Sequence, residues 1–347
     1  MQSIAIVGAG VAGLGAAYAL RDRDATVTVF ERAERVGGRS ATRRTAERTY
    51  DTGANYLKEG DDRVTALVTG PLSSGLVETE GPVWTFDADG AVSPGRDEDE
   101  RKWTYESGIA TLATRLREAA GATVETGTPV ETLRRTGDGW AVETGGTGAG
   151  GSSAGESAAF DAVVLTPPAP ETAALLADAD WDHPDRERVR AAAAAVPYRC
   201  ILSVALGYSH PVERPYYALV NTDREHAVGW LAREECKPGH VPDGESLLVA
   251  QMAPDWSADR FDDGDDAVAA DAARRAAALL DDDRLRSPDW HDTVRWRRAL
   301  PDEGVDAVSV AAARDHDLYP AGDWVAGEAR LHAALSSGLE AGERAVD

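Results

Sequence analysis

Cysteine and lysine are scarce in this sequence of 347 residues. The only cysteines are Cys200 and Cys236, too few for a disulfide framework or a zinc site. The only lysines are Lys58, Lys102 and Lys237, so arginine carries most of the positive charge. Motifs of hydrolases and metalloproteases, such as G-x-S-x-G and H-E-x-x-H, are absent, and we predict no metal site.

Long apolar runs are missing as well. No stretch reaches the roughly 18 uninterrupted apolar residues of a membrane-spanning helix. The apolar run at the N-terminus is broken by glycines and lacks the charged lead-in and cleavage site of a signal peptide. We therefore expect a cytoplasmic protein that does not cross a membrane.

Acidic residues are abundant and spread along the whole chain. The 60 acidic and 36 basic residues give a net charge of −24, with acidic runs at 97–100, 262–266 and 281–283. Such a surface repels nucleic acids and anionic membranes, so the partners we expect are small molecules. The composition looks like that of a halophilic, haloarchaeal protein in which salt screens the repulsion. Each run by itself is most simply a solvated face.

The first forty residues carry the strongest motif. An apolar run of strand length, Gln2–Val7, leads into a helical stretch, and a second strand-like run ends at Glu31. Glycines at G-x-G-x-x-G spacing join the first strand to the helix: Gly8, Gly10 and Gly13. The order of strand, glycine turn, helix, strand and acid predicts a dinucleotide site rather than a chance glycine-rich turn.

Each part of this motif has a physical task. The first glycine permits a tight turn, the second lets the backbone approach a pyrophosphate, and the third lets helix and strand pack closely. The helix N-terminus at Val11 and Ala12 offers free N–H groups to phosphates. Glu31 lies about twenty residues on, where a carboxylate binds the ribose hydroxyls, with Arg32 beside it.

A second glycine pair follows at once, in the segment ERAERVGGR. Gly37 and Gly38 allow another close approach of the backbone, and Arg39 can supply charge to the same phosphates. Alone, this would be an ordinary basic loop. After the first motif, it resembles the E-x-x-x-x-x-G-G-R element of the FAD-dependent amine oxidase superfamily, which implies bound FAD. We expect the FAD to be non-covalent, because neither cysteine lies near the C-terminal flavin segment.

Further segments sharpen the resemblance. The turn D-T-G-A-N-Y, residues 51–56, resembles a segment of renalase-like flavoproteins that lies along the flavin ring, although a plain turn with a half-buried Tyr56 is an equal alternative. W-R-x-A-L-P, starting at Trp296, resembles a hallmark of bacterial and archaeal renalase-like proteins. Asp323 follows a strand, where open α/β sheets bind ligands, and in the family it meets the ribitol chain. Ala333 stands where many relatives have glycine.

The site residues that the motifs and the resemblance imply form two sets. Flavin-face candidates for catalysis are Asn55, Tyr56 and Trp296. The remaining cofactor contacts implied are Gly53, Ala54, Val130 near the adenine, Thr166, Asp323, Ala334 and Leu335, in addition to the residues of the two glycine loops.

The predicted fold is α/β with two domains. A Rossmann-like FAD-binding domain of the p-hydroxybenzoate hydroxylase and amine oxidase type takes residues 1–60, 105–170 and 296–347. A discontinuous substrate domain with a mostly antiparallel sheet takes residues 61–104 and 171–295. The first segment should contain a hairpin around Asp89-Gly90, and a helix over 107–120 should be capped by Ser107.

Three functions remain open. A renalase-like oxidase would transfer a hydride from an isomeric dihydronicotinamide to the flavin and pass electrons to O2 or another acceptor. An amine oxidase or desaturase would act on an amine or isoprenoid; amine oxidases of this superfamily typically hold a lysine near the flavin, and an amine favours an aromatic cage. A non-catalytic flavoprotein is the third. The sequence leaves the oligomeric state open.

Overall fold

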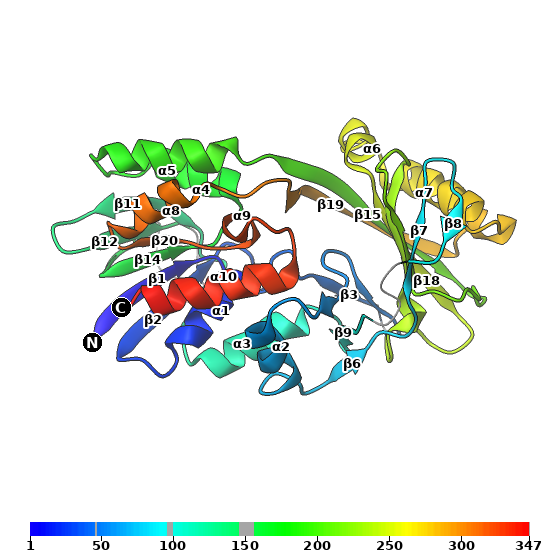
Figure 1. The fold of residues 1–347 in the computed structure, drawn as a ribbon, viewed down its shortest axis with the longest axis horizontal. Coiled ribbons are helices and arrows are strands. Elements are labelled where there is room, and N and C mark those ends of the chain that lie inside the picture. The colour runs from blue at the N-terminus through cyan, green and yellow to red at the C-terminus, as the bar shows by residue number, and fades with distance from the viewer. Residues whose placement is uncertain (46, 96–99, 146–155, 347) are drawn as a thin grey trace.

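The structure, a computed structural model, describes residues 1–45, 47–95, 100–145 and 156–346. Two sheets organise it, one at each end of the long axis (Figure 1). The first sheet is wholly parallel, and its strands stand in the order β10 (Thr123–Thr126), β2 (Ala25–Glu31), β1 (Gln2–Val7), β14 (Ala162–Leu165) and β20 (Leu318–Pro320). The second sheet has the order β19 (Trp290–Pro301), β15 (Tyr198–Tyr208), β18 (Ser246–Met252), β17 (Val228–Arg233), β16 (Ala218–Asn221), β7 (Val83–Phe86) and β8 (Val92–Ser93).

Shorter strands and the helices complete the described chain. The small sheets pair β11 (Val130–Arg135), β12 (Trp140–Thr144) and β13 (Glu156–Phe160); β3 (Thr42–Arg44) and β4 (Thr49–Asp51); and β5 (Leu57–Lys58), β9 (Lys102–Tyr105) and β6 (Leu76–Glu78). The α-helices are α1 (Val11–Leu20), α2 (Asp62–Thr69), α3 (Thr111–Ala120), α4 (Ala169–Ala177), α5 (Pro184–Ala195), α6 (Pro254–Asp259), α7 (Asp265–Leu279), α8 (Ala307–Arg314), α9 (Asp323–Ala326) and α10 (Leu331–Arg344). Short 3₁₀ turns are η1 (Glu234–Cys236) and η2 (Asp283–Arg286).

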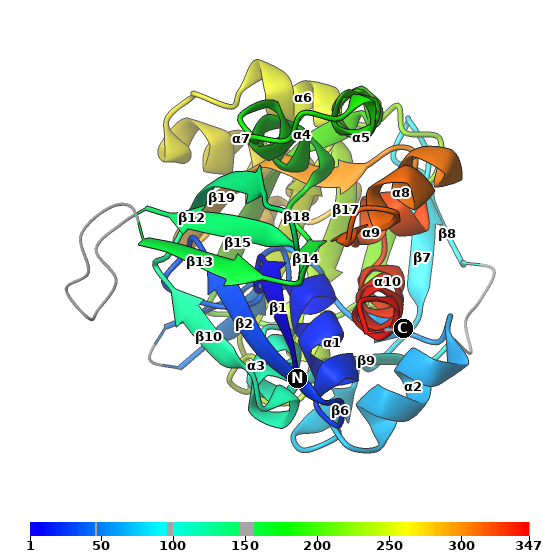
Figure 2. The same ribbon diagram turned by 90° about the vertical axis from the view of Figure 1, so that its left-hand side faces the viewer.

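The parallel sheet is covered on both faces, as its continuous apolar strands require. Because side chains alternate along a strand, β1 sends Ile4 and Ile6 into one core with α1, α3 and α10. Ala5 and Val7 enter a second core with β11, β12 and α4. Figure 2 shows α1 and α10 beside this sheet, and the β11–β12–β13 sheet on its other side.

The second sheet is mostly antiparallel, with one parallel pairing between β16 and β7. Its outer face is covered by α6 and α7, where Val268, Ala272 and Ala276 pack against strand residues such as Leu206 and Leu248. The long strands β15 and β19 extend back from this sheet toward the first (Figure 1). A mixed α/β fold with a parallel and a mostly antiparallel part is therefore confirmed.

Residues 61–104 divide between the two parts. Helix α2 contributes Val64, Leu67 and Val68 to the core of β1 and α1, whereas β7 and β8 form the predicted hairpin and join the second sheet. The residue ranges assigned to the two domains remain a prediction. The predicted cap at Ser107 is wrong: α3 begins at Thr111 after Ala110, and no side chain caps it. Among the described residues, no helix combines the length and the apolar character needed to cross a membrane.

Candidate functional site

The first glycine loop joins β1 to α1. Gly8 has φ +97°, a conformation that L side chains rarely adopt, and its N–H donates to Phe30 O at 2.8 Å. A Cβ on Gly13 would lie 1.9 Å from Gly8 O, so only glycine fits there. A Cβ on Gly10 would meet no atom within 4 Å. The open side of Gly10 is therefore free for a ligand, and the fold does not fill it.

The second glycine loop lies against the first. Gly37 N–H donates to Ala9 O at 2.8 Å, and a Cβ on Gly38 would come within 3.6 Å of Gly10 Cα. Gly37 and Gly38 have φ of +113° and +54°. Helix α1 starts beside them with no side-chain cap, so its first N–H groups at Val11 and Ala12 are available. Two backbone loops and a helix N-terminus thus converge, the arrangement that binds a pyrophosphate.

Glu31 ties these loops together. Its carboxylate accepts from Ala9 N–H and Ala33 N–H, both at 2.8 Å, and the residue is 9% exposed. A carboxylate has lone pairs left for ribose hydroxyls, so its predicted role is compatible with these bonds and stays a prediction. Thr128 N–H donates to Glu31 O at 2.9 Å, which places the start of β11 at Val130 nearby. Arg32 is exposed, with Nη2 3.9 Å from Glu171.

Thr166 lies against the first glycine loop, and Ala334 and Leu335 of α10, predicted as cofactor contacts, lie near helix α1. Thr166 Oγ1 donates to Val7 O at 2.8 Å, and it would lie 2.7 Å from a Cβ on Gly8. Leu335 is fully buried and packs on Gly15 of α1, and Ala334 is 8% exposed. The Leu335 side chain therefore belongs to the core between α1 and α10, which leaves backbone groups for any contact with the cofactor.

Arg39 and Asp323, predicted separately as cofactor contacts, bind each other. Two parallel hydrogen bonds of 2.7 and 2.8 Å join the guanidinium to the carboxylate, and Arg39 also donates to Ala299 O at 3.0 Å. Burial alone would lower the pKa of Arg39, but the charge of Asp323 raises it above its ordinary value. The pair joins the second glycine loop to the start of α9.

The segment 52–54 is held by both sheets. Ala54 N–H donates to Arg39 O at 3.0 Å, and a Cβ on Gly53 would lie 2.0 Å from that same oxygen. From the second sheet, Trp296 Nε1 donates to Thr52 O and Gln251 Nε2 donates to Gly53 O, both at 2.7 Å. The structure thus brings Arg39, Gly53, Ala54 and Trp296 together, and adds Gln251, which no sequence motif indicated.

Tyr56 enters a triangle of aromatic rings with Tyr217 and Trp230. The three pairs of ring centroids are 6.2, 5.9 and 6.1 Å apart. Burial raises the pKa of Tyr56 and of Tyr217, so both hydroxyls stay neutral. Three polar atoms here are buried without a hydrogen-bond partner among the described residues: Asn55 Oδ1, Tyr217 Oη and Trp230 Nε1. Buried polar atoms are nearly always paired, so each of these three atoms is a candidate for a contact with a ligand or a water molecule.

A buried charge network lies directly before this segment. Lys237 Nζ is 2.8 Å from Asp51 Oδ2 and 2.8 Å from Glu234 Oε1, and all three side chains are inaccessible to solvent. His240 joins through Nδ1, 3.1 Å from Glu234, while its Nε2 lies 3.0 Å from Tyr105 O. Both ring nitrogens of His240 thus face oxygen atoms of the network or its surroundings.

Each lysine already has a partner. Lys237 lies in the charge network, and Lys58 pairs with Glu100 at 2.9 Å. Lys102 donates to Glu100 O at 2.7 Å. A lysine held for contact with a flavin is therefore not evident in the described part of the chain.

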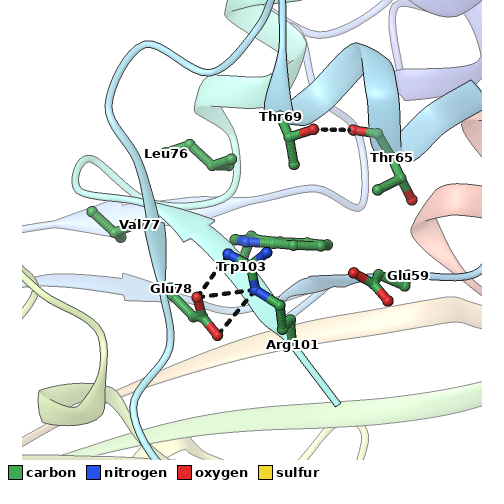
Figure 3. A pocket seen from close by; sticks show the side chains of 8 residues that line it. All are labelled: Glu59, Thr65, Thr69, Leu76, Val77, Glu78, Arg101 and Trp103. Carbon is green, nitrogen blue, oxygen red and sulfur yellow. Dashed lines mark hydrogen bonds and ion pairs between the residues drawn. The ribbon is translucent and has the colours of Figure 1, made fainter. Parts of the chain in front are cut away.

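A pocket of about 390 Å³ opens elsewhere, between α2 and the β5–β9–β6 sheet (Figure 3). Its wall includes Trp103, Glu59 and the ion pair of Arg101 with Glu78, whose guanidinium lies 5.1 Å from the Trp103 ring. None of its lining residues belongs to the glycine loops or the aromatic triangle. The predicted flavin contacts lie outside it.

Sequence patterns in two parts of the chain match known families. The profile described as "NAD(P)-binding Rossmann-like domain" matches residues 6–69, and the profile described as "Flavin containing amine oxidoreductase" matches residues 78–346.

Curated relatives match over a short segment. Protoporphyrinogen oxidase 2 of Arabidopsis thaliana is 45% identical over 67 residues, which are 19% of this chain and 13% of that protein. A protein of Mycobacterium tuberculosis, provisionally named a flavin-containing monoamine oxidase, is 46% identical over 66 residues, 19% of this chain and 14% of that protein. The aligned segment is thus far shorter than the relatives themselves.

Solved structures match over the full length. A protein from Exiguobacterium sp. 255-15, provisionally named protoporphyrinogen oxidase, has a TM-score of 0.77 at 17% identity and covers 99% of this chain and 98% of that one. Wild-type putrescine oxidase bound to putrescine has a TM-score of 0.71 at 14% identity and covers 100% of this chain and 98% of that one. At such identities the likeness establishes the fold.

Proposed function

Because the chain belongs to the flavin-containing amine oxidoreductase family, whose cofactor here is FAD, we propose that it carries out a renalase-like oxidation. Its substrate would be an isomeric dihydronicotinamide, and O2 or another small molecule would accept the electrons. We further propose the assignment of residues 1–60, 105–170 and 296–347 to the FAD-binding domain. The segment 51–56 would form the boundary with the substrate side.

The choice of a dihydronicotinamide as the substrate rests on one observation. The three unpartnered buried atoms are an amide oxygen, a phenol hydroxyl and an indole N–H, on Asn55, Tyr217 and Trp230. A neutral carboxamide offers two N–H donors and one carbonyl acceptor, so it matches this set of acceptors and donors. A flat nicotinamide ring also suits a lining of aromatic side chains.

In this proposal the residues of the chain bind FAD, orient the substrate and shield the reaction from water. When bound, FAD supplies the ring that accepts a hydride. The glycine loops and the N-terminus of α1 would hold the pyrophosphate, with Glu31 at the ribose and Asp323 at the ribitol chain. Gln251 and Trp296 would fix the carbonyls of 52–53, and the aromatic triangle would exclude water.

Oxidation of an amine is the second candidate, and the aromatic triangle favours it. Three rings about 6 Å apart can surround an ammonium group through cation–π attraction. The engagement of Lys58, Lys102 and Lys237 weighs against it, since amine oxidases of this superfamily typically keep a lysine near the flavin. A non-catalytic flavoprotein is the third candidate, and it predicts that no donor reduces the flavin.

The test is anaerobic mixing of the yellow holoprotein, in high salt, with dihydronicotinamide isomers made by chemical reduction of NAD. Rapid bleaching of the flavin band by the isomers, but not by ordinary β-NADH, supports the proposal. Putrescine and protoporphyrinogen belong in the same panel, because matched proteins carry those names. Bleaching by putrescine alone selects the amine candidate, and bleaching by protoporphyrinogen alone assigns the chain to that reaction instead.

Variants separate the cofactor site from the substrate site. Gly10→Ala meets nothing in the protein within 4 Å, so it should fold normally and lose FAD. Glu31→Ala should also weaken FAD retention, and full occupancy in either variant contradicts the assigned cofactor site.

Tyr56→Phe and Trp296→Phe should keep FAD but slow its reduction. Unchanged reduction rates in both would refute the placement of the flavin face.

A further inference from the structure

Three potential metal ligands meet on the side of the parallel sheet away from α1. His183 and Asp185 lie at the start of α5, and His316 lies in the turn between α8 and β20, the two regions that stack at one end of the molecule in Figure 1. Asp185 Oδ2 is 3.3 Å from His183 Nδ1 and 3.2 Å from His316 Nε2. One ligand atom from each of the three residues lies within 4.8 Å of the other two.

Two of the three ligand-to-ligand spacings fit a tetrahedral metal ion. Metal–nitrogen and metal–oxygen bonds of about 2.0–2.1 Å place neighbouring ligands of a tetrahedron about 3.3 Å apart. Both measured separations from Asp185 Oδ2 agree with that value. Two imidazoles and one carboxylate form a three-ligand set that leaves the fourth position to water.

Hydrogen bonds within the cluster involve both oxygens of Asp185. Arg188 binds the other oxygen of Asp185, Oδ1, at 3.0 Å. His183 Nδ1 accepts from Asp185 N–H at 3.2 Å, and the same nitrogen is 3.3 Å from Asp185 Oδ2. Because an imidazole nitrogen has one lone pair, a bound metal ion would replace this hydrogen bond. The positive end of helix α5 opposes a cation here, and the charge of Asp185 offsets it.

An apolar wall backs the two imidazoles. The Trp181 ring stacks on His183 at 6.0 Å and meets His316 edge-on at 5.0 Å, and Trp140 lies behind Trp181 at 5.3 Å. Trp140 Nε1 fixes the backbone oxygen of His316 at 2.9 Å. Rigid apolar surroundings of this kind hold ligands in place and strengthen metal binding.

The buried charge network around Lys237 differs from this cluster of three ligands. Asp51, Glu234 and His240 also bring three ligand atoms together, but the ammonium of Lys237 already occupies the position of a cation there. In the α5 cluster, no ammonium group lies among the three ligand atoms of the described residues: Arg188 binds Oδ1 of Asp185, and Oδ2 is hydrogen-bonded to His316 Nε2 at 3.2 Å.

We propose that His183, Asp185 and His316 bind one divalent transition-metal ion of the zinc, cobalt or nickel class. Imidazole ligands select these ions over Mg²⁺ and Ca²⁺. The ion ties the N-terminus of α5 to the turn that begins β20. The site lies apart from the residues assigned to the flavin, and the proposal is independent of the reaction proposed above.

The test is equilibrium dialysis of the untagged, EDTA-stripped holoprotein against Zn²⁺, in high salt with excess Mg²⁺ to suppress weak binding to the acidic surface. We expect one Zn²⁺ per chain. His183→Ala, His316→Ala and Asp185→Asn should each weaken binding by at least about tenfold, since each removes a bond to a charged centre. The control is His210→Ala, whose imidazole lies near Tyr208, away from the cluster.

Two further measurements keep the proposal testable if a variant folds poorly. Zn²⁺ should raise the melting temperature of the unaltered protein, and it should protect two histidines from diethylpyrocarbonate. Absence of tight Zn²⁺ binding, or equal binding in the control and in all three variants, would overturn the proposal. Binding without protection of His183 and His316 would place the ion elsewhere and overturn it as well.

Discussion

Lys237 shows how a single side chain can join two distant parts of the chain. It is fully buried, and it bonds Asp51 on one side and Glu234 on the other. Burial alone would lower the pKa of Lys237, but the two carboxylates raise it above the ordinary value of 10.5, so the amine is charged. Asp51 is the first residue of the segment 51–56, and the network therefore fixes where that segment starts.

Substitution of Lys237 by Met should be strongly destabilising. The change leaves Asp51 and Glu234 buried together without a cation, a situation that costs about 3–5 kcal/mol of unfolding free energy. The matched control is Lys58→Met, whose partner Glu100 is partly exposed and whose loss should cost no more than about 1 kcal/mol. Urea unfolding of both variants measures the difference, and equal stabilities would contradict the assigned role of the network.

Acid should weaken the same network. Burial raises the pKa of Glu234, but Lys237 and His240 outweigh it, and the net pKa lies below the ordinary value of 4.5. A depressed pKa means that the stabilisation is present above about pH 4.5 and is lost as pH falls through the folded-state value. Urea midpoints measured from about pH 6 down to pH 3 should therefore decline. A midpoint that stays constant over this range would contradict the prediction.

Cys236 should be an unreactive thiol at neutral pH. Burial raises its pKa from 9.0 to about 11, so its thiolate fraction near neutrality is about a hundredfold below that of an ordinary thiol. Alkylation by iodoacetamide should be slow in the native protein and fast in urea. Rapid native labelling of this residue, located by peptide mapping, would show that the site opens.

At the scale of elements, two helices pack at unusually close range. A Cβ on Gly338 of α10 would lie 2.0 Å from Ala12 O in α1, and one on Gly342 would lie 2.4 Å from Ala16 O. Leu335 fills the space over Gly15 on the other helix. Because α1 starts at the first glycine loop, this contact also sets the direction in which its free N–H groups point.

Gly338→Ala should push α10 away from α1. Overpacking of this kind costs about 1–3 kcal/mol, and the shift of α1 should weaken FAD binding too. Gly137→Ala is the control, because a Cβ there meets nothing within 4 Å. Thermal unfolding and flavin retention report the two effects. Stability equal to that of the control would mean that the helices can separate without cost.

At the scale of the whole molecule, the main feature is the large excess of negative charge. A net charge of −24 on 347 residues produces mutual repulsion that favours unfolding. Many arginines pair with acids, for example Arg43 with Asp292 and Arg63 with Glu343, and this local pairing relieves only part of the excess.

Salt should therefore stabilise the protein. Raising ionic strength from about 0.1 M to 1 M shortens the screening length from about 10 Å to about 3 Å, which removes most repulsion between surface carboxylates. The melting temperature should rise over this range in KCl. Sucrose at equal osmolality serves as the control for solvent exclusion, and a melting temperature that falls with KCl would contradict a net repulsive surface.

The sequence by itself determined the cofactor half of this protein. The glycines at 8, 10, 13, 37 and 38 and the acid at 31 lie within one local strand–turn–helix–strand unit, and their spacing suffices because neighbouring residues fix the geometry. The sequence likewise predicted a mostly antiparallel sheet in the substrate domain, and the second sheet confirms it. Local periodicity can specify such elements, whereas the Ser107 cap failed because the chain forms a turn there before α3 begins.

Only the tertiary structure decided which residues from distant parts of the sequence lie next to each other. Tyr56 meets Tyr217 and Trp230, Gly53 meets Gln251, and Asp51 meets Lys237, all pairs more than 150 residues apart. Their contacts depend on the register of the second sheet and on how that sheet docks against the first, and no local pattern encodes either. The same is true of His183 and His316, which approach because α5 packs on α8.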